Sequence, residues 1–150
     1  MKSILRTILA WLTVCAPFTA NAGYYSNTAA YYLQGSGSSQ ALANYYAGIG
    51  LAYANPSYLY YAYTSLNSAY SQAYNAYLYA YYQYAYQESS PECYYSQYYS
   101  YLAQDNANYA QLYTYYVYLG YSSYIGPAIQ SNYYMQDNTS WANYYNFLCG

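Results

Sequence analysis

The chain has 150 residues, of which 35 are tyrosine, and its only basic side chains are Lys2 and Arg6. It has four acidic residues and no histidine, so it lacks the usual general base and the imidazole ligand for a metal. No lysine that could act as a nucleophile follows Lys2. This composition argues against an enzyme. Because no basic side chain follows Arg6, the composition also excludes nucleic-acid binding through phosphate neutralisation and electrostatic attachment to anionic lipid.

The first 22 residues have the pattern of a secretory signal peptide. Lys2 and Arg6 form a charged start, an apolar run covers residues 8–18, and Ala-Asn-Ala at residues 20–22 matches an A-x-A cleavage site. The apolar run is too short to cross a bilayer, which takes about 20 residues. A secreted protein is therefore favoured over a membrane anchor, and we expect an extracellular chain that leaves the membrane after cleavage.

Residues 23–56 are predicted to form an N-terminal segment rich in tyrosine, glycine and serine. The Gly-Ser-Gly-Ser-Ser stretch at residues 35–39 has the composition of a flexible linker. A short helix is expected after it, near residues 40–54. Asn55 then precedes Pro56, a capping residue followed by a proline suited to the first turn of another helix.

Residues 57–150 are predicted to form a tyrosine-rich helical domain, with helices at about 57–88, 91–119 and 128–148. Tyrosine favours strands, and the alternation of tyrosine over residues 77–81 fits a strand's period of two. The segments between breakers are, however, far longer than ordinary strands.

Heptad spacing decides between the two readings, because it makes one stripe on a helix and no coherent face on a strand. The rows concerned are Leu59, Leu66, Ala73 and Ala80, then Ala62, Ala69 and Ala76, with Tyr63, Tyr70, Tyr77 and Tyr84 beside them. We therefore predict an all-α fold, an antiparallel helical hairpin or small bundle with a flexible N-terminal segment. A low-complexity β or amyloid-like structure is the alternative.

Two cysteines, Cys93 and Cys149, lie beyond the predicted signal peptide. In a secreted chain an even number of cysteines indicates a disulfide. Their midpoint falls beside Gly120, which suits a helix C-terminus, so antiparallel helices folded back there would bring the two cysteines level. Two free thiols, or a bridge between chains, are the alternatives.

Few other residues suggest a site. Glu88 and Glu92 are separated by the break at Ser90-Pro91 and are interpreted as helix-terminal charges, not as a catalytic pair. The ligands for a metal are missing, so no metal, cofactor or catalytic residue is predicted. The Asn-Thr-Ser sequence at 138–140 makes Asn138 a candidate glycosylation acceptor in a eukaryotic secretory pathway.

The reactive groups left in the chain are the phenols of its tyrosines. Oxidation of tyrosine gives radicals that couple to dityrosine, while hydroxylation gives catechols such as DOPA. Adjacent tyrosines spread rings around a helix, where they can meet neighbouring molecules. The candidate cross-linking residues are the pairs Tyr24 and Tyr25, Tyr45 and Tyr46, Tyr81 and Tyr82, Tyr94 and Tyr95, Tyr98 and Tyr99, and Tyr144 and Tyr145. The oxidant has to come from an external phenol oxidase or peroxidase, because the chain has no histidine to hold copper or haem.

Two runs, YLYAYYQYAY at residues 77–86 and YYSQYYSY at 94–101, carry a resemblance in composition. With the signal peptide, they make the chain resemble the tyrosine-rich eggshell precursors of trematode flatworms. The resemblance implies a secreted protein whose tyrosines are converted to catechols and tanned by a phenol oxidase. The chain departs from many such precursors in lacking abundant lysine, histidine and glycine, which disfavours quinone–amine coupling.

Three hypotheses for the function follow. The first is a secreted structural protein of an extracellular coat, eggshell or matrix, which assembles with itself and is hardened by oxidative tyrosine cross-linking. The second is an extracellular filament or amyloid that assembles without covalent bonds. The third is a secreted tyrosine-rich binding module.

Overall fold

Residues 23–150 are described by a computed structural model, and the predicted signal peptide at residues 1–22 lies outside the described residues. The four long helices are α2 (Tyr24–Ala52), α3 (Pro56–Tyr82), α4 (Pro91–Tyr118) and α5 (Ile125–Cys149). A π-helical turn, η1 (Gln83–Gln87), extends α3, and a 3₁₀ turn, η2 (Ser122–Tyr124), precedes α5. Residues 23–150 contain no strand. The all-α prediction is confirmed, and the β alternative is wrong for this part of the chain.

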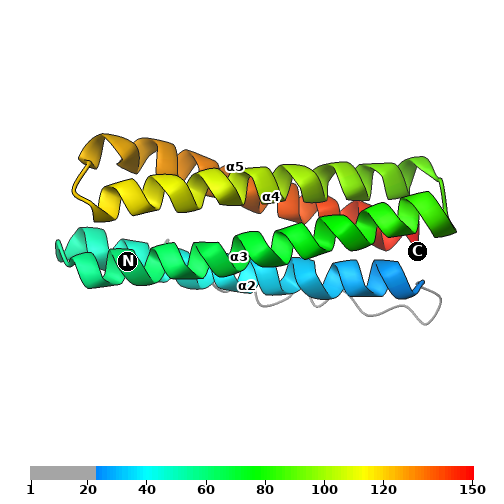
Figure 1. Cartoon of the computed structure of the whole chain (residues 1–150), viewed down its shortest axis with the longest axis horizontal. Coiled ribbons are helices and arrows are strands. Elements are labelled where there is room, and N and C mark those ends of the chain that lie inside the picture. Colours follow the sequence, from blue (N-terminus) through cyan, green and yellow to red (C-terminus); the bar gives the residue numbers. More distant parts are fainter. Residues whose placement is uncertain (1–22) are drawn as a thin grey trace, which may run out of the picture.

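The helices form an antiparallel bundle in which each helix folds back along the one before it (Figure 1). We call the contact line between two helices a seam. The α2–α3, α3–α4 and α4–α5 seams are closely packed, whereas α2 and α5 make much sparser contact. The turns after α2 and α4 lie at one end of the bundle, and the start of α2 and the C-terminus lie at the other (Figure 1).

Side-chain caps explain where two of the helices begin. The Asn55 side chain accepts a hydrogen bond from the Ser57 backbone N–H at 3.0 Å, and the Ser90 hydroxyl accepts one from the Cys93 N–H at 3.3 Å. Each cap is followed by a proline in the first turn, where its missing N–H costs no hydrogen bond. Gly120, with a φ of 95°, lies just after α4 and supplies the left-handed conformation that ends a helix.

The predicted ends of the last three helices agree with the structure to within a few residues. The first of them continues through η1 to Gln87 by changing to π-helical bonds. Helix α5 starts at Ile125 instead of residue 128. Gly126 and Pro127 lie inside its first turn, where a proline is tolerated.

The predicted division of the N-terminal segment into a linker and a short helix was wrong. The expected linker at 35–39 and the expected short helix at 40–54 are parts of the single helix α2. Ser36 is buried and its hydroxyl donates to the Ala69 carbonyl oxygen of α3 at 3.0 Å. The Gln72 side chain occupies the space that a Cβ on Gly35 would need. Small residues that disfavour an isolated helix are used here for close contact with α3, so packing overrides propensity.

Small side chains also make up most of the bundle core. Buried residues recur at alternating steps of three and four along the helices, which places them on one inward stripe. In α4 these residues are Cys93, Ser96, Ser100, Ala103, Ala107, Ala110, Thr114 and Val117. In α3 the predicted alanine stripe is confirmed: Ala62, Ala69, Ala73, Ala76, Ala80 and Leu66 are buried, while Leu59 is half-buried.

The core contains no tyrosine. All 35 tyrosines lie within the described residues, and none of them is buried. The larger apolar side chains that are buried are Leu33, Leu66, Val117 and Met135. The helices therefore approach through alanine, serine and a few medium-sized residues, and the space between them is too narrow for rings.

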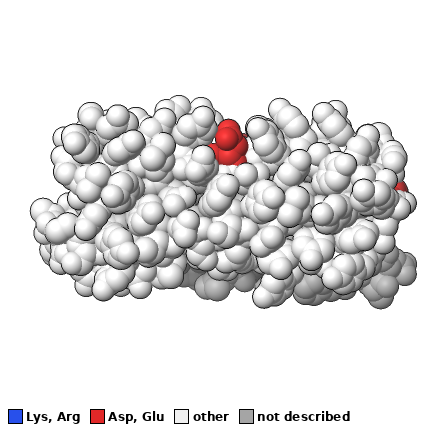
Figure 2. Space-filling model, in the orientation of Figure 1, with Lys and Arg blue, Asp and Glu red and all other residues white. Residues whose placement is uncertain are grey.

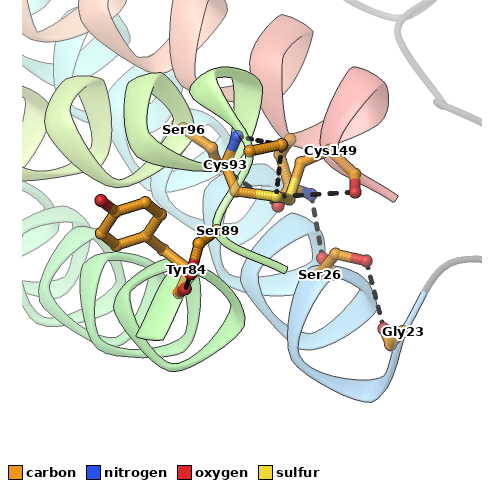
Figure 3. The surroundings of a disulfide bond; sticks show 9 residues. Gly23, Ser26, Tyr84, Ser89, Cys93, Ser96 and Cys149 are labelled. Carbon is orange, nitrogen blue, oxygen red and sulfur yellow. Dashed lines mark hydrogen bonds between the residues drawn. A yellow bond between two sulfur atoms is a disulfide. The ribbon is translucent and has the colours of Figure 1, made fainter. Parts of the chain in front are cut away.

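The disulfide joins Cys93 in the first turn of α4 to Cys149 at the end of α5, with the two sulfur atoms 2.01 Å apart (Figure 3). Both cysteines are buried, and Ser26 of α2 and Ser96 of α4 lie around the bridge. The pairing predicted within the chain is therefore present in the structure. It arises because the turn at Gly120 returns α5 along α4 in the expected register.

Enlarging a core alanine tests the narrow packing. Ala107→Leu is expected to lower the free energy of unfolding by about 1–3 kcal/mol, because the added methyl groups have no space between the helices. The control Ala41→Leu changes an exposed position of α2 and is expected to have little effect. Thermal unfolding followed by circular dichroism measures both, and equal effects of the two substitutions would contradict the packing described here.

Removing the disulfide tests its contribution to stability. The bridge closes a loop between residues 56 positions apart, which corresponds to about 4 kcal/mol if it acts by restricting the unfolded chain. Cys93→Ser with Cys149→Ser is expected to lower the midpoint of urea unfolding at unchanged helical content under native conditions. An unchanged midpoint would show that the bridge adds no stability.

Candidate functional site: the tyrosine shell

The tyrosines form a shell around the small-residue core. The half-buried tyrosines occupy positions beside the buried stripe, where one side of the ring lies over the core and the hydroxyl reaches the surface. Tyr70 packs against the buried group that includes Ala69 and Met135, and Tyr32 and Tyr99 pack against the group that includes Leu33. The predicted row of Tyr63, Tyr70, Tyr77 and Tyr84 is half-buried throughout. These rings thus cover the core from outside and are not part of it.

Most rings belong to three networks in which each ring contacts another. The first network joins α2 to α3 and η1: Tyr24, Tyr25, Tyr31, Tyr32, Tyr79, Tyr81, Tyr82 and Tyr86. The third network joins η1 and α4 to α5: Tyr84, Tyr94, Tyr95, Tyr98, Tyr99, Trp141, Tyr144 and Tyr145.

The second network is the largest and lies toward the end of the bundle that carries the turns after α2 and α4. It consists of Tyr45, Tyr46, Tyr58, Tyr60, Tyr61, Tyr63, Tyr109, Tyr113, Tyr115, Tyr116, Tyr118, Tyr121 and Tyr124. Because it contains residues of α2, α3, α4 and η2, it crosses two seams.

The structure brings the two members of every predicted adjacent pair into ring contact. The centroid distances are 5.4 Å for Tyr24–Tyr25, 5.5 Å for Tyr45–Tyr46, 5.9 Å for Tyr81–Tyr82, 5.6 Å for Tyr94–Tyr95, 5.4 Å for Tyr98–Tyr99 and 5.2 Å for Tyr144–Tyr145. Their ring planes are steeply inclined, from 58° to 73°. This follows from the helix, since consecutive side chains point in directions about 100° apart.

Sequence reasoning missed the rings that connect neighbouring helices. Tyr63 of α3 lies 5.2 Å from Tyr115 of α4, and Tyr79 of α3 lies 5.7 Å from Tyr32 of α2. The shortest ring distance, 4.8 Å, joins Tyr116 to Tyr124 of η2. The heptad row that contains Tyr63 was the one available signal, because a residue beside the core stripe faces the next helix.

Two rings at the centres of networks are held in the neutral form. The neighbouring Tyr24 phenol, followed by partial burial and by Tyr32, raises the pKa of Tyr79 above its usual 10.0. Partial burial, followed by the phenols of Tyr99, Tyr144 and Tyr95 and the carboxylate of Glu92, raises the pKa of Tyr145. In both cases a negative phenolate is disfavoured because its neighbours are acidic or apolar.

The surface of the shell carries very few charges. Figure 2 shows a face that is almost free of charged side chains, with acidic groups only near its upper edge and at one end. Within residues 23–150, no group of three or more histidine, cysteine or acidic side chains could hold a metal ion. Glu92 lies in the first turn of α4, as predicted, and Glu88 lies just after η1.

Asn138 lies in the middle of α5, although it was expected to be a candidate glycosylation acceptor. Its side-chain nitrogen, the atom to which a glycan would be attached, donates a hydrogen bond to the Tyr134 carbonyl oxygen at 2.8 Å. In the folded bundle this amide is therefore engaged with the helix backbone. Among the described helices α2–α5, none combines the length and hydropathy needed to span a membrane.

Among the described residues, the α2–α5 seam differs from the other three in having no ring contact, and amide side chains hydrogen-bond across it. The Gln40 side-chain nitrogen donates to the Asn132 carbonyl oxygen at 2.6 Å, and that of Asn146 donates to the Ser26 carbonyl oxygen at 2.9 Å. Asn132 also donates to the Asn44 side chain. Towards the turns, a cavity of about 230 Å³ opens along this seam, lined by residues such as Ala47, Leu51, Ile125 and Ile129.

No protein-family model, curated protein or solved structure matches this chain. The shell, the core and the disulfide are therefore the observations from which its function is argued.

The raised pKa of Tyr79 and Tyr145 predicts a loss of stability in alkali. The folded protein keeps these protons at pH values where an unfolded chain has released them, so the stabilisation is complete below pH 10.0 and is lost as the pH rises through the folded pKa. Melting temperatures are expected to stay level up to about pH 10 and to fall above it. Tyr79→Phe should reduce that fall, and Tyr74→Phe, outside the three networks, should not. An equal effect of the two substitutions would contradict the assignment.

Proposed function

We propose that the chain is a secreted structural protein of an extracellular coat, eggshell or matrix, hardened by oxidative cross-linking of its tyrosines. An external phenol oxidase or peroxidase supplies the oxidising equivalents, and the principal partner is a second copy of the chain. One observation carries the proposal: the bundle builds its core without burying any of its 35 tyrosines. If the rings served only to pack, the largest apolar groups would fill the interior.

The exposed rings are distributed over all four helices and both ends of the bundle. The most exposed are Tyr53 at 78%, Tyr86 at 72%, Tyr24 at 67%, Tyr31 at 63%, Tyr133 at 63% and Tyr45 at 60%. A binding face is local, whereas this display extends around the molecule, which supports a network with several neighbours over a binding module. Large exposed apolar surface also favours association.

The charge of the protein supports ring–ring coupling as the covalent step. The chain beyond Arg6 has no lysine side chain that could add to a quinone. Two phenols can couple without an amine, by forming a carbon–carbon bond between their ortho positions. Beyond the predicted signal peptide only four side chains are charged, Glu88, Glu92, Asp105 and Asp137. Electrostatic repulsion between copies is therefore weak over most of the surface, and the rings of neighbouring molecules can approach.

A filament of folded bundles without covalent bonds is the second candidate. It is favoured by exposed apolar side chains that are not tyrosine, among them Ile129 at 61%, Phe147 at 52% and Leu119 at 49%. These groups gain by burial against another molecule but have no oxidative chemistry. The two candidates differ in what dissolves the material. Denaturant with reductant should dissolve a non-covalent filament and should leave a cross-linked coat insoluble.

The native extracellular material tests the proposal. Its acid hydrolysate is expected to contain dityrosine or DOPA, measured by mass spectrometry against authentic standards, and most of this protein should resist extraction by denaturant with reductant. Purified protein treated with peroxidase and hydrogen peroxide should form covalent oligomers, with protein treated by peroxide alone as the control. Assembled material that contains neither modified residue, and that dissolves fully, would falsify the proposal.

A further inference from the structure

Two pairs of tyrosines lie across seams at shorter distances than any other ring pairs between the four long helices. Tyr63 of α3 and Tyr115 of α4 have ring centroids 5.2 Å apart, with planes inclined by 44°. Tyr95 of α4 and Tyr145 of α5 have centroids 5.1 Å apart, with planes inclined by 36°. Members of each pair are about 50 residues apart in the sequence, so only the fold brings them together.

The inclination of the rings favours these pairs over sequence neighbours. The unpaired electron of a phenoxyl radical occupies π orbitals that point out of the ring plane, so two rings couple when their faces are turned towards each other. Adjacent tyrosines such as Tyr98–Tyr99 and Tyr144–Tyr145 meet edge to face, at 72° and 73°. They are close enough to touch, but their orbitals are poorly aligned for a bond.

In both cross-helix pairs one ring is accessible and its partner is more enclosed. Tyr115 is 37% exposed and Tyr95 is 43% exposed, whereas Tyr63 and Tyr145 are half-buried. The accessible ring meets an external oxidant, and its enclosed partner is held at a fixed distance by the packed helices. A coupled pair has its centroids slightly closer than the distances observed here, a change that side-chain motion on the nanosecond timescale provides.

We propose that oxidation forms dityrosine within single chains, at Tyr63–Tyr115 and at Tyr95–Tyr145, so that α3, α4 and α5 become covalently joined. This inference rests on the proposed oxidative function. In each pair, both phenols lose one electron and the hydroxyl proton, and the two ortho carbons form a bond. The ring proton at each bonded carbon then moves to the oxygen and restores both hydroxyls. Peroxidase with hydrogen peroxide accepts the two electrons and two protons, and the peroxide becomes water.

With bonds at these two positions, α2 would still be covalently joined to the other helices only through the turn that follows it. The α2–α5 seam is held by amide hydrogen bonds, such as that from Gln40 to Asn132, and carries the cavity. The disulfide also lies on the α4–α5 side. A chain oxidised in this way therefore has three cross-linked helices, and keeps the exposed tyrosines of α2 for bonds to other chains.

The test uses dilute protein, because partners within one chain are then at a far higher effective concentration than partners in other chains. The protein is treated with peroxidase and hydrogen peroxide, and the monomer is isolated, reduced and alkylated. A protease that cuts after Glu88, Glu92, Asp105 and Asp137 then places the two tyrosines of each pair in different fragments. Reduction is needed because the disulfide joins two of the same fragments.

Two linked products are expected by mass spectrometry, each lighter by two hydrogen atoms than the sum of its fragments. One joins the fragment that ends at Glu88 to fragment 106–137, through Tyr63 and Tyr115. The other joins fragment 93–105 to fragment 138–150, through Tyr95 and Tyr145. Fragment ions place the bond at these residues.

Matched substitutions identify the partners. Tyr95→Phe should abolish the second product, while Tyr99→Phe should preserve it. The Tyr99 and Tyr145 rings are nearly parallel, at 1°, but their centroids are 5.6 Å apart, against 5.1 Å for Tyr95 and Tyr145. Tyr115→Phe should abolish the first product, and Tyr118→Phe, which removes the contact with Tyr60, should preserve it. Circular dichroism of each variant shows that it is folded.

The outcomes separate this inference from the proposed function. Dityrosine that occurs only in oligomers, or only between adjacent tyrosines, overturns the inference and leaves the proposed function standing. Loss of the second product in Tyr99→Phe but not in Tyr95→Phe overturns the assignment of that pair. If neither monomers nor oligomers contain dityrosine, and the native material also lacks modified tyrosine, both fail.

Discussion

The close approach of the helices through small side chains is the constraint on which the rest of the structure depends. Alanine and serine at the inward positions leave no room for rings, so each tyrosine must lie beside the stripe or outside it. Helices this close gain extensive dispersion contacts along their backbones. The same closeness makes serine useful inside, since the hydroxyl of Ser36 can reach the backbone of α3. A core of leucine would separate the helices and admit rings between them.

The tyrosine shell follows from that constraint and carries the chemistry that we propose. A ring beside the stripe covers apolar core atoms with one face and leaves its hydroxyl in water. Neighbouring rings then contact each other, because there are too many to remain separate. At crowded centres such as Tyr79 and Tyr145, acidic neighbours and partial burial keep the phenol neutral. The surface is thus aromatic, nearly uncharged and oxidisable, a combination suited to a material that assembles and is then hardened.

The four seams are not equivalent. Ring contacts connect α2 to α3, α3 to α4 and α4 to α5, and the disulfide strengthens the last of these. The seam between α2 and α5 instead relies on amides such as Gln40 and Asn146. An amide hydrogen bond within the protein replaces hydrogen bonds to water, so its net contribution to stability is modest. Ring contacts, in contrast, also bury apolar area. The proposed oxidation therefore reinforces the α3–α4 and α4–α5 seams, while the α2–α5 seam keeps its amides and its cavity.

The sequence by itself determined the helical class, the starts of α3 and α4, the alanine stripe and the cysteine pairing. Periodicity, caps at Asn55 and Ser90, and symmetry of the cysteines about Gly120 are local or simple geometric signals. It misled at residues 35–39, where glycine and serine suggested a linker, because their role is to allow contact with α3, which composition does not reveal. The adjacent tyrosines were visible in the sequence, but the pairs that face each other across seams were not. Which ring of α4 meets Tyr63 or Tyr145 depends on the axial register of neighbouring helices, and only packing of the whole core sets that register.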